Sequence, residues 1–392
     1  MRASKRVAGQ PVEHRAVTRT GTRQEGGGGE ARGIGNAAGD IIVAAEHAAG
    51  RVTLNRPAVL NALTTPMRAA LAAVLPRWIR DPEIYAMVIT SATDRAFCAG
   101  GDLRELVDWG RNRRADAVAS LAQEYALDWA LECFAKPTVS LIDGAVMGSG
   151  VGISLYGTHR VAGERYRLAM PETGVGLFPD VGVAWAFARL PDAIGMYLAL
   201  TGRAIGRADA YRLGLATHCV PAARFGDIAA RLADADPVDE LLDGFHADPG
   251  PGELEALAPA IARCFSAPTV EEILARLQAE RGPAAAWAQE TAGELARRSP
   301  VSLKITHRHV RLARNLDLRA TLVQDFRLAC RCLDGHDLYE GVRALLIDRD
   351  RAPRWQPARL EDVSEAMVEA YFAPLEAELE LPTRAAMQAF EP

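Results

Sequence analysis

Residues 136–190 read KPTVSLIDGAVMGSGVGISLYGTHRVAGERYRLAMPETGVGLFPDVGVAWAFARL, and this segment combines glycine-rich backbone with acidic side chains. Residues 138–142 form a short apolar run rich in β-branched residues, and the turn signal Asp143-Gly144 follows. The segment GSGVG at 148–152 then predicts the start of a helix. The first N–H groups of a helix have no partner within it, and the helix dipole favours negative charge there. The pattern predicts half of an oxyanion hole.

Two carboxyl groups follow on proline-punctuated, otherwise apolar segments, Glu172 in MPETG and Asp180 in FPDVG. Loss of water around such a carboxyl raises its pKa towards a value useful for acid or base catalysis. Each feature also has a simpler interpretation. A glycine-rich helix start is often a packing device, and a glutamate after proline is often only a favourable charge at a helix N-terminus. Their combination favours a catalytic site.

The preceding sequence contains a second unit of this kind, a strand followed by a glycine-rich loop and a helix start. A hairpin is predicted from residues 41–45 and 51–55 with Gly50 in its turn, followed by a helix from Thr65 through Trp78. Residues 85–90 predict a buried strand, and AFCAGGD at 96–102 predicts a strand end, a glycine loop and a helix start. Two such units imply a layered α/β core, and each could supply one N–H donor to a shared oxyanion hole.

Between the two glycine loops, residues 115–134 predict a helix with Glu124, Asp128 and Glu132 four residues apart and therefore on one face. Such a stripe of carboxylates is usually a solvent-exposed face. Short helices at 194–200 and 207–213 and a last strand at 216–220 follow. Helical periodicity dominates from residue 225 onwards.

Three regions are predicted from these patterns. Residues 1–38, which are rich in glycine and arginine, are expected to be a disordered tail. Residues 39–225 are expected to form the α/β core that contains the site. Residues 226–392 are expected to form an α-helical region.

Composition narrows the class of protein. The 392 residues are 49% hydrophobic and 24% charged, as in soluble globular proteins with a large core. A net charge of -5 argues against nucleic-acid binding, and no run approaches the ~18 apolar residues that a membrane span needs. The six cysteines are scattered without a CxxC pair or metal-ligand spacing, which predicts free thiols in a reducing, cytoplasmic location.

Several motifs in matching order resemble the crotonase (enoyl-CoA hydratase/isomerase) superfamily, and within it the 3-hydroxyisobutyryl-CoA hydrolase branch. The resemblance covers roughly residues 40–360 and is carried by the following segments: VTLNRPAVLNAL (52–63), AFCAGGDLREL (96–106), DGAVMGSGVG (143–152), AMPETGVGLFPDVG (169–182), LALTGR (198–203), GLATH (214–218), SPVSLKIT (299–306) and EGVRALLIDRDRAPRW (340–355).

The resemblance implies a fold and a set of backbone contacts. The expected fold is a crotonase-like spiral of ββα units followed by an α-helical C-terminal region. The expected ligand is an acyl-CoA thioester, with its carbonyl oxygen held by the backbone N–H groups of Gly101 and Ser149. The loop residues Gly100, Asp102 and Gly148 are expected beside the substrate.

The resemblance also implies side-chain roles. Glu172 would attack the thioester or activate water, and the sequence does not separate these two roles. Asp180 would orient the substrate or move the proton. Glu124 would contact a hydroxyl of the substrate, with a plain helix-face charge as the alternative. Arg56 and Lys304 are weaker candidates for contacts with the CoA phosphates.

The expected reaction is hydrolysis of a short 3-hydroxyacyl-CoA, above all 3-hydroxyisobutyryl-CoA, as in valine degradation. It would need no metal and no redox cofactor, because CoA is part of the substrate. Homo-oligomers are common in the superfamily and are expected on that ground alone. The alternatives are an enoyl-CoA hydratase or isomerase and a non-catalytic acyl-CoA binding protein.

Three positions separate these options or depart from the branch pattern. The first of the two glutamates with which hydratases add water would match Gly152, and glycine cannot transfer a proton. Ser149 replaces the middle glycine of the usual GGG, which should be tolerated because the donor is a backbone N–H. Val183 stands where the branch has a second glycine after PDVG, a change that bears on the acyl group and not on the reaction.

Overall fold

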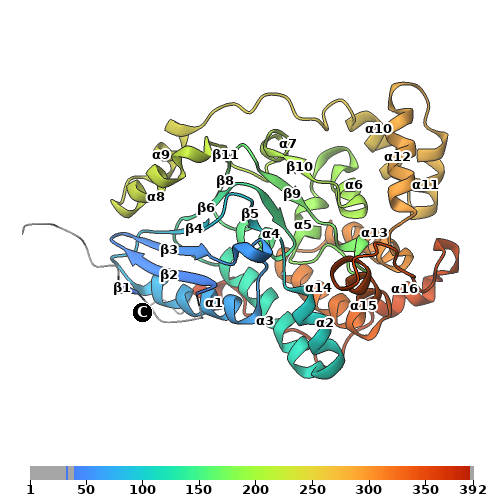
Figure 1. Cartoon of the computed structure of the whole chain (residues 1–392), viewed down its shortest axis with the longest axis horizontal. Coiled ribbons are helices and arrows are strands. Elements are labelled where there is room, and N and C mark those ends of the chain that lie inside the picture. Colours follow the sequence, from blue (N-terminus) through green and yellow to red (C-terminus); the bar gives the residue numbers. More distant parts are fainter. Residues whose placement is uncertain (1–31, 34–38, 389–392) are drawn as a thin grey trace, which may run out of the picture. The chain divides into compact units, whose positions relative to one another are not determined.

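The computed structural model describes residues 32–33 and 39–388, which belong to one compact unit, Ala31–Pro392 (Figure 1). The predicted tail, residues 1–38, lies outside the described residues except for Arg32–Gly33 and Gly39. Arg32–Gly33 pair with β2 as a short strand, and the bounds of the predicted tail stay a prediction.

The main sheet has seven strands in the order β1-β2-β3-β4-β6-β8-β11. The pairs β1–β2 and β2–β3 are antiparallel and the others are parallel. The strands are β1 (Arg32–Gly33), β2 (Ile41–Glu46), β3 (Ala49–Leu54), β4 (Ala86–Ser91), β6 (Thr138–Ile142), β8 (His159–Ala162) and β11 (His218–Cys219).

The hairpin is confirmed, but the prediction that Gly50 lies in its turn was wrong. The turn is at His47–Ala48, with His47 in the left-handed region (φ 49°), and Gly50 lies inside β3 opposite Ala45. A Cβ on Gly50 would lie 2.6 Å from the ring of Trp78. Glycine is therefore present because a helix packs closely on the strand, not because the chain reverses there.

A smaller sheet has four strands in the order β10-β9-β7-β5, with β5, β7 and β9 parallel. Its strands are β5 (Ala96–Cys98), β7 (Ala145–Met147), β9 (Arg167–Ala169) and β10 (Ile205–Gly206). Three times in succession the chain makes a strand of the main sheet, then a strand of the small sheet, then a helical segment. The predicted spiral of ββα units is confirmed.

The helices of the first half follow these strands. They are α1 (Thr65–Arg80), α2 (Leu103–Asn112), α3 (Arg114–Glu132), α4 (Ser149–Leu155), the 3-10 turn η2 (Glu172–Gly174), α5 (Val183–Phe187), α6 (Ile194–Thr201) and α7 (Arg207–Arg212).

Every described element after β11 is helical, as predicted for this part of the chain. The α-helices are α8 (Phe225–Ala233), α9 (Val238–Phe245), α10 (Ala258–Phe265), α11 (Val270–Ala279), α12 (Ala285–Leu295), α13 (Pro300–Ala313), α14 (Leu318–Asp334), α15 (Asp337–Val342), α16 (Glu365–Phe372) and α17 (Arg384–Gln388).

The main sheet separates two cores, as the alternation of side chains along β4 shows. Met87 and Ile89 belong to the large core that contains the site, whereas Ala86 and Val88 belong to a smaller core closed by α8 and α9. Both cores therefore combine strands of the first half with helices that come after residue 225.

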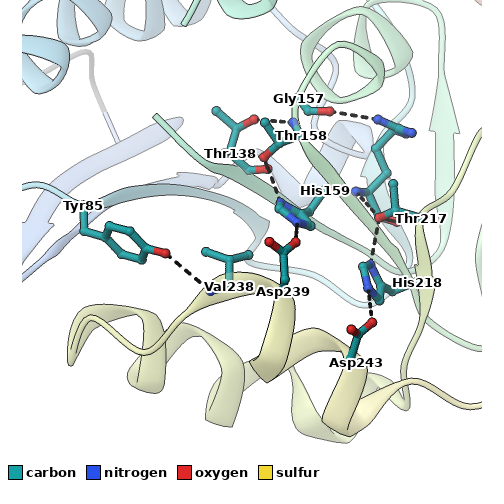
Figure 2. Close-up of polar contacts among 11 residues, drawn as sticks. Tyr85, Thr138, Gly157, Thr158, His159, Thr217, His218, Val238, Asp239 and Asp243 are labelled. Atoms are coloured by element: carbon teal, nitrogen blue, oxygen red, sulfur yellow. Dashed lines mark hydrogen bonds and ion pairs between the residues drawn. The ribbon is translucent and has the colours of Figure 1, made fainter. Parts of the chain in front are cut away.

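Polar contacts hold α9 against the sheet (Figure 2). His159 and His218 face Asp239 and Asp243, with Nε2 to Oδ1 distances of 2.8 and 3.3 Å. These histidines therefore have a structural role in joining α9 to β8 and β11. Among the described residues, no helix has the length and apolar character that crossing a membrane would require.

Candidate active site

Gly101, the first of the two predicted backbone donors, lies in the loop between β5 and α2. The N–H of Leu63 donates to the carbonyl of Gly100, and the N–H of Asp102 donates to the carbonyl of Leu63, both at 2.8 Å. Gly101 lies between these two hydrogen bonds in a parallel bridge, so its own N–H points away from Leu63. A Cβ built on Gly101 would lie 2.9 Å from Ser149 Oγ. The free N–H of one glycine loop thus belongs to a residue beside the other loop.

Ser149, the second predicted donor, is the first residue of α4. The preceding Gly148 has φ 47° and ψ −124°, a conformation that side-chain-bearing residues rarely adopt. Gly148 O accepts from the N–H groups of Val151 and Gly152, at 2.8 and 3.2 Å, which leaves the first N–H of the helix outside this pattern. Because Gly148 takes the strained conformation, a serine at 149 is tolerated, as the sequence predicted.

The two loops and Glu172 meet at Gly148. A Cβ on Gly148 would lie 3.3 Å from Gly100 Cα and 3.2 Å from Glu172 Oε1. Gly100 itself has φ 108°. Only glycine combines this backbone path with such a close approach, so the glycine pattern brings the two loops and the carboxyl group of Glu172 together.

Glu172 begins η2 and is 9% exposed, and its Oε2 has no hydrogen-bond partner among the described residues. Burial raises the pKa of Glu172 well above its usual range, and the negative charge of Asp180 raises it further. The guanidinium of Arg298 acts in the opposite direction. A carboxyl with an unpaired oxygen and a raised pKa suits attack on a carbonyl or proton transfer from water.

Asp180 is half-buried, and its Oδ2 accepts a hydrogen bond from the hydroxyl of Tyr125 at 2.8 Å. Burial raises its pKa well above the usual range, and the charges of Glu124 and Asp325 add to the effect, while the Tyr125 bond opposes it. Glu172 and Asp180 therefore form a pair of carboxyl groups that both retain protons more readily than in water.

The loop after Asp180 is anchored by residues that the sequence analysis missed. Val181 and Gly182 both have positive φ, 51° and 75°. The N–H of Gly182 donates to Asp325 Oδ2 at 2.6 Å, and His309 Nε2 lies 2.6 Å from Asp325 Oδ1. Asp325 on α14 and His309 on α13 are almost fully buried. No local sequence motif indicates their role. The only signal in the sequence is that Asp325 falls on the apolar, buried face that the periodicity of α14 predicts.

The carboxylate stripe of α3 contradicts the prediction of a solvent-exposed face. Glu124 is 7% exposed and Asp128 is 1% exposed, because α1, α2 and α14 all pack against α3. Glu124 Oε1 accepts from the hydroxyl of Ser149, and its Oε2 lies 3.5 Å from Arg68 Nη1. Of the three predicted positions, only Glu132 is more than slightly exposed, and it pairs with Arg384.

Gly152 faces Asp128. A Cβ at this position would lie 2.7 Å from Asp128 Oδ1 and 2.9 Å from Val181 Cβ. The space into which a hydratase's first glutamate would project is therefore already filled. The structure gives a steric reason, beyond the absent carboxyl, why residue 152 is glycine.

The other predicted binding residues already have protein partners. Asp102 caps α2, accepting from the N–H groups of Arg104 and Glu105, and its Oδ2 lies 2.8 Å from Arg56 Nη1. Lys304 Nζ lies 2.6 Å from Glu271 and donates to the carbonyl of Val363. Val183 is fully buried in the first turn of α5.

A surface pocket of about 340 Å³ lies along α2, the helix that begins directly after the Gly101 loop. Its lining combines two cations with apolar and polar groups, namely Arg104, Val107, Asp108, Arg111, Asn112 and Ile347. Within residues 32–33 and 39–388, no group of three or more His, Cys, Asp or Glu side chains is arranged to hold a metal ion.

Comparison with known proteins places the chain among acyl-CoA enzymes. A model of the enoyl-CoA hydratase/isomerase family matches residues 49–372. The mitochondrial 3-hydroxyisobutyryl-CoA hydrolase of Danio rerio is 40% identical over 338 residues, which are 84% of this chain and 88% of the relative. The protein of the same name from Homo sapiens is 38% identical over 350 residues, 87% of this chain and 90% of the relative.

Two solved structures share the fold closely. A carnitinyl-CoA dehydratase from Mycobacterium thermoresistibile has a TM-score of 0.82 at 39% identity and covers 87% of this chain and 98% of its own. An enoyl-CoA hydratase from Rhodobacter sphaeroides has a TM-score of 0.80 at 39% identity, covering 86% and 98%. Their names describe the addition or removal of water, whereas the curated relatives are named as hydrolases.

Proposed function

The chain belongs to the enoyl-CoA hydratase/isomerase family, and from that premise we propose that it hydrolyses the thioester of a short 3-hydroxyacyl-CoA, with 3-hydroxyisobutyryl-CoA as substrate. The observation that carries this proposal is the meeting of Glu172 with the two glycine loops at Gly148. One carboxyl with an unpaired oxygen stands beside two backbone donors, which is the arrangement that acyl transfer requires.

In the proposed reaction the thioester carbonyl oxygen lies between the N–H groups of Gly101 and Ser149. These donors stabilise the negative charge that develops as the carbonyl carbon is attacked, and one such donor typically contributes a factor of ~10² to 10³ in rate. They need no reorganisation during the reaction, because the strand bridge at Leu63 and the start of α4 hold them in place.

Glu172 acts on the carbonyl carbon by one of two routes. As a general base it takes a proton from water, the water oxygen bonds to carbon, and the C–S bond breaks. As a nucleophile its carboxylate displaces CoA to form a mixed anhydride, which water then cleaves. In both routes the leaving thiolate receives a proton, and Asp180, hydrogen-bonded to Tyr125, is the proposed group that orients the substrate or moves that proton.

The remaining part of the substrate would follow α2. Glu124, Gly100, Asp102 and Gly148 surround the donors and are kept as substrate-side residues. The pocket along α2 starts three residues after Gly101 and offers Arg104 and Arg111 to the phosphates of CoA. Because CoA belongs to the substrate, the reaction needs no metal and no redox cofactor.

A second candidate is an enoyl-CoA hydratase or isomerase, which the names of the two solved structures favour. It would have to operate with Glu172 alone or with Asp180. The side chain of Asp128 and that of Val181 leave no room for a second glutamate at position 152. Hydrolysis is therefore the better supported reaction.

The test is a free-thiol assay with purified protein and 3-hydroxyisobutyryl-CoA, 3-hydroxypropionyl-CoA and crotonyl-CoA in parallel. We expect rapid thiol release from the two hydroxyacyl thioesters and little from crotonyl-CoA. Loss of the crotonyl-CoA absorbance without thiol release would indicate a hydratase instead. Binding of all three without any reaction would indicate a non-catalytic acyl-CoA binding protein.

We further propose a place for this reaction in valine degradation, a cytoplasmic location and a homo-oligomeric state. The curated relatives are named as mitochondrial, so location needs its own measurement by cell fractionation. Analytical ultracentrifugation of the purified chain would give the oligomeric state.

A further inference from the structure

Glu124 has little capacity left for a substrate hydroxyl. Its Oε1 already accepts from Ser149 Oγ, and its Oε2 faces Arg68. Arg68 is itself buried and is held by the hydroxyls of Thr65 and Ser120, at 3.1 and 2.6 Å. This network holds Glu124 against the start of α4, where it supports the oxyanion donor.

Asp128, one helical turn further along α3, differs from Glu124 in having no such partner. It is 1% exposed, and its Oδ2 has no hydrogen-bond partner among the described residues. An unpaired buried carboxyl is costly, so a partner supplied by the substrate would be a physical reason to keep it.

The position of Asp128 relative to the donors suits the acyl chain. Its Oδ1 lies where the Cβ of residue 152 would point, and Gly152 is three residues after the donor Ser149. Three residues of helix span about 4.5 Å. A hydroxyl on C3 of an acyl chain is two carbons beyond the thioester carbonyl, so it falls within hydrogen-bonding reach of a group at that distance.

We propose that Asp128 is a specificity-determining residue that hydrogen-bonds the 3-hydroxyl of the acyl chain; this rests on the proposed hydrolysis of a hydroxyacyl thioester. Glu124 then serves chiefly to fix Ser149.

The protonation state of Asp128 suits this role. Burial raises the pKa of Asp128 well above its usual range, and the charges of Glu124, Asp180 and Asp325 raise it further, with Arg68 opposing them. A neutral carboxylic acid has both an O–H donor and a carbonyl acceptor, so it can donate to the oxygen of a hydroxyl or accept from its hydrogen. An acyl chain without a hydroxyl leaves both unpaired.

Sites built to bind a hydroxyl reject analogues that lack it, because their own buried polar groups are left without partners. The test compares kcat/KM for 3-hydroxyisobutyryl-CoA and isobutyryl-CoA, which differ only in the hydroxyl. We expect the wild-type protein to prefer the hydroxylated substrate by roughly 10-fold to 100-fold. Asp128→Leu should reduce that ratio by about 10-fold or more while retaining turnover of isobutyryl-CoA.

Three further variants make the comparison specific. Asp128→Asn keeps a donor and an acceptor and should retain most of the preference. Glu132→Gln, one turn along the same helix and paired with Arg384 outside the cluster, should leave the ratio unchanged. Glu124→Gln should leave the ratio of kcat/KM for the two substrates unchanged. If Asp128→Leu does not fold, Asp128→Ala provides the same comparison.

An unchanged ratio in the folded Asp128→Leu or Asp128→Ala protein would overturn the proposal. So would a ratio that collapses in Glu124→Gln alone. If the wild-type protein releases no thiol from either thioester, the proposed hydrolysis is wrong. The ratio of the two dissociation constants, measured by titration calorimetry in wild type and Asp128→Leu, then tests Asp128 in the same way.

Discussion

On the donor side of the site, backbone hydrogen bonds and the conformation of Gly148 position Gly101 and Ser149, the two proposed donors, whereas on the carboxylate side Asp180 depends on side chains of a distant helix. The donors are held by a bridge to Leu63 and by the turn at Gly148. The loop after Asp180 is held by Asp325, 143 residues away from Gly182. Hydrogen bonds of the backbone define one side, and buried side chains from α13 and α14 define the other.

This difference predicts which substitutions lower the rate on each side of the site. A donor can be removed only by changing the backbone, and side-chain changes there should have little effect on the rate. The carboxylate side can be weakened from far away, by substitutions that never touch the substrate. The experiments below compare the two sides, beginning with the largest expected effect.

Ser149→Pro removes the donor N–H itself. Ser149 is the first residue of α4, a position where proline is well tolerated, so the helix should still form. We expect kcat to fall by ~10² to 10³, the usual cost of one oxyanion donor. Ser149→Ala is the matched control, because it loses the same hydroxyl but keeps the N–H, and its kcat should stay within about threefold. Equal losses in both variants would mean that the hydroxyl, and not the backbone, is the active group.

Asp325→Ala tests the remote anchor of the other side. Without Asp325 the N–H of Gly182 loses its acceptor, and the positive-φ residues after Asp180 are free to relax. We expect kcat to fall by roughly 10-fold to 100-fold with little change in KM, since small displacements of catalytic groups have effects of this size. Asp325→Asn, which can still accept from Gly182, should recover part of the loss.

A control is needed to distinguish a loss of folding stability from a displacement of the catalytic groups. Asp317→Ala removes the N-cap of the same helix, where its carboxylate accepts from the N–H of Ala320. It should cost about 1 kcal/mol of stability without a comparable effect on kcat. If Asp317→Ala lowered kcat as much as Asp325→Ala, the anchor would have no specific role.

The raised pKa of Glu172 predicts a pH-dependent gain in stability for Glu172→Gln. Between the unfolded-state pKa, near 4.5, and the higher folded-state pKa, the folded wild type binds more protons than the unfolded chain, so its stability falls as pH rises. Glutamine cannot ionise and avoids this loss. Urea unfolding should show the variant more stable than the wild type at pH 8, with the difference vanishing near pH 4.

Glu255→Gln, at an exposed position, is the control for that measurement and should show no such pH-dependent gain. A Glu172→Gln variant that is equally stable at pH 8 would mean that the carboxylate is better solvated than its burial indicates.

Part of the site could be predicted from sequence because its backbone requirements leave short motifs in the chain. Glycine is required where Gly148 meets Gly100 and Glu172, and such requirements leave visible glycine patterns. The alternation of β-rich runs with glycine-opened helices predicts a layered α/β core, whereas the ββα spiral was implied by the resemblance to the crotonase superfamily. Glu172 and Asp180 could be found because each stands in a short proline-containing motif, MPETG and FPDVG.

The parts that could not be predicted depend on packing between distant elements. The periodicity of α3 places Glu124 and Asp128 on one face correctly but does not say that other helices cover that face. Asp325 and His309 lie in ordinary helical patterns, and only the folded chain brings them to Gly182. Gly50 was assigned to a turn because the ring of Trp78 above it could not be foreseen.

The central claim is that the carboxyl of Glu172 acts on a thioester held by the two donors. The most direct test is thiol release from 3-hydroxyisobutyryl-CoA by the wild type and Glu172→Gln, with the dissociation constant of the thioester measured in both. The account predicts a loss in kcat of about 10² to 10⁴ with nearly unchanged affinity, because the carboxylate acts mainly in the transition state. A Glu172→Gln protein that turns over the thioester at the wild-type rate would contradict it.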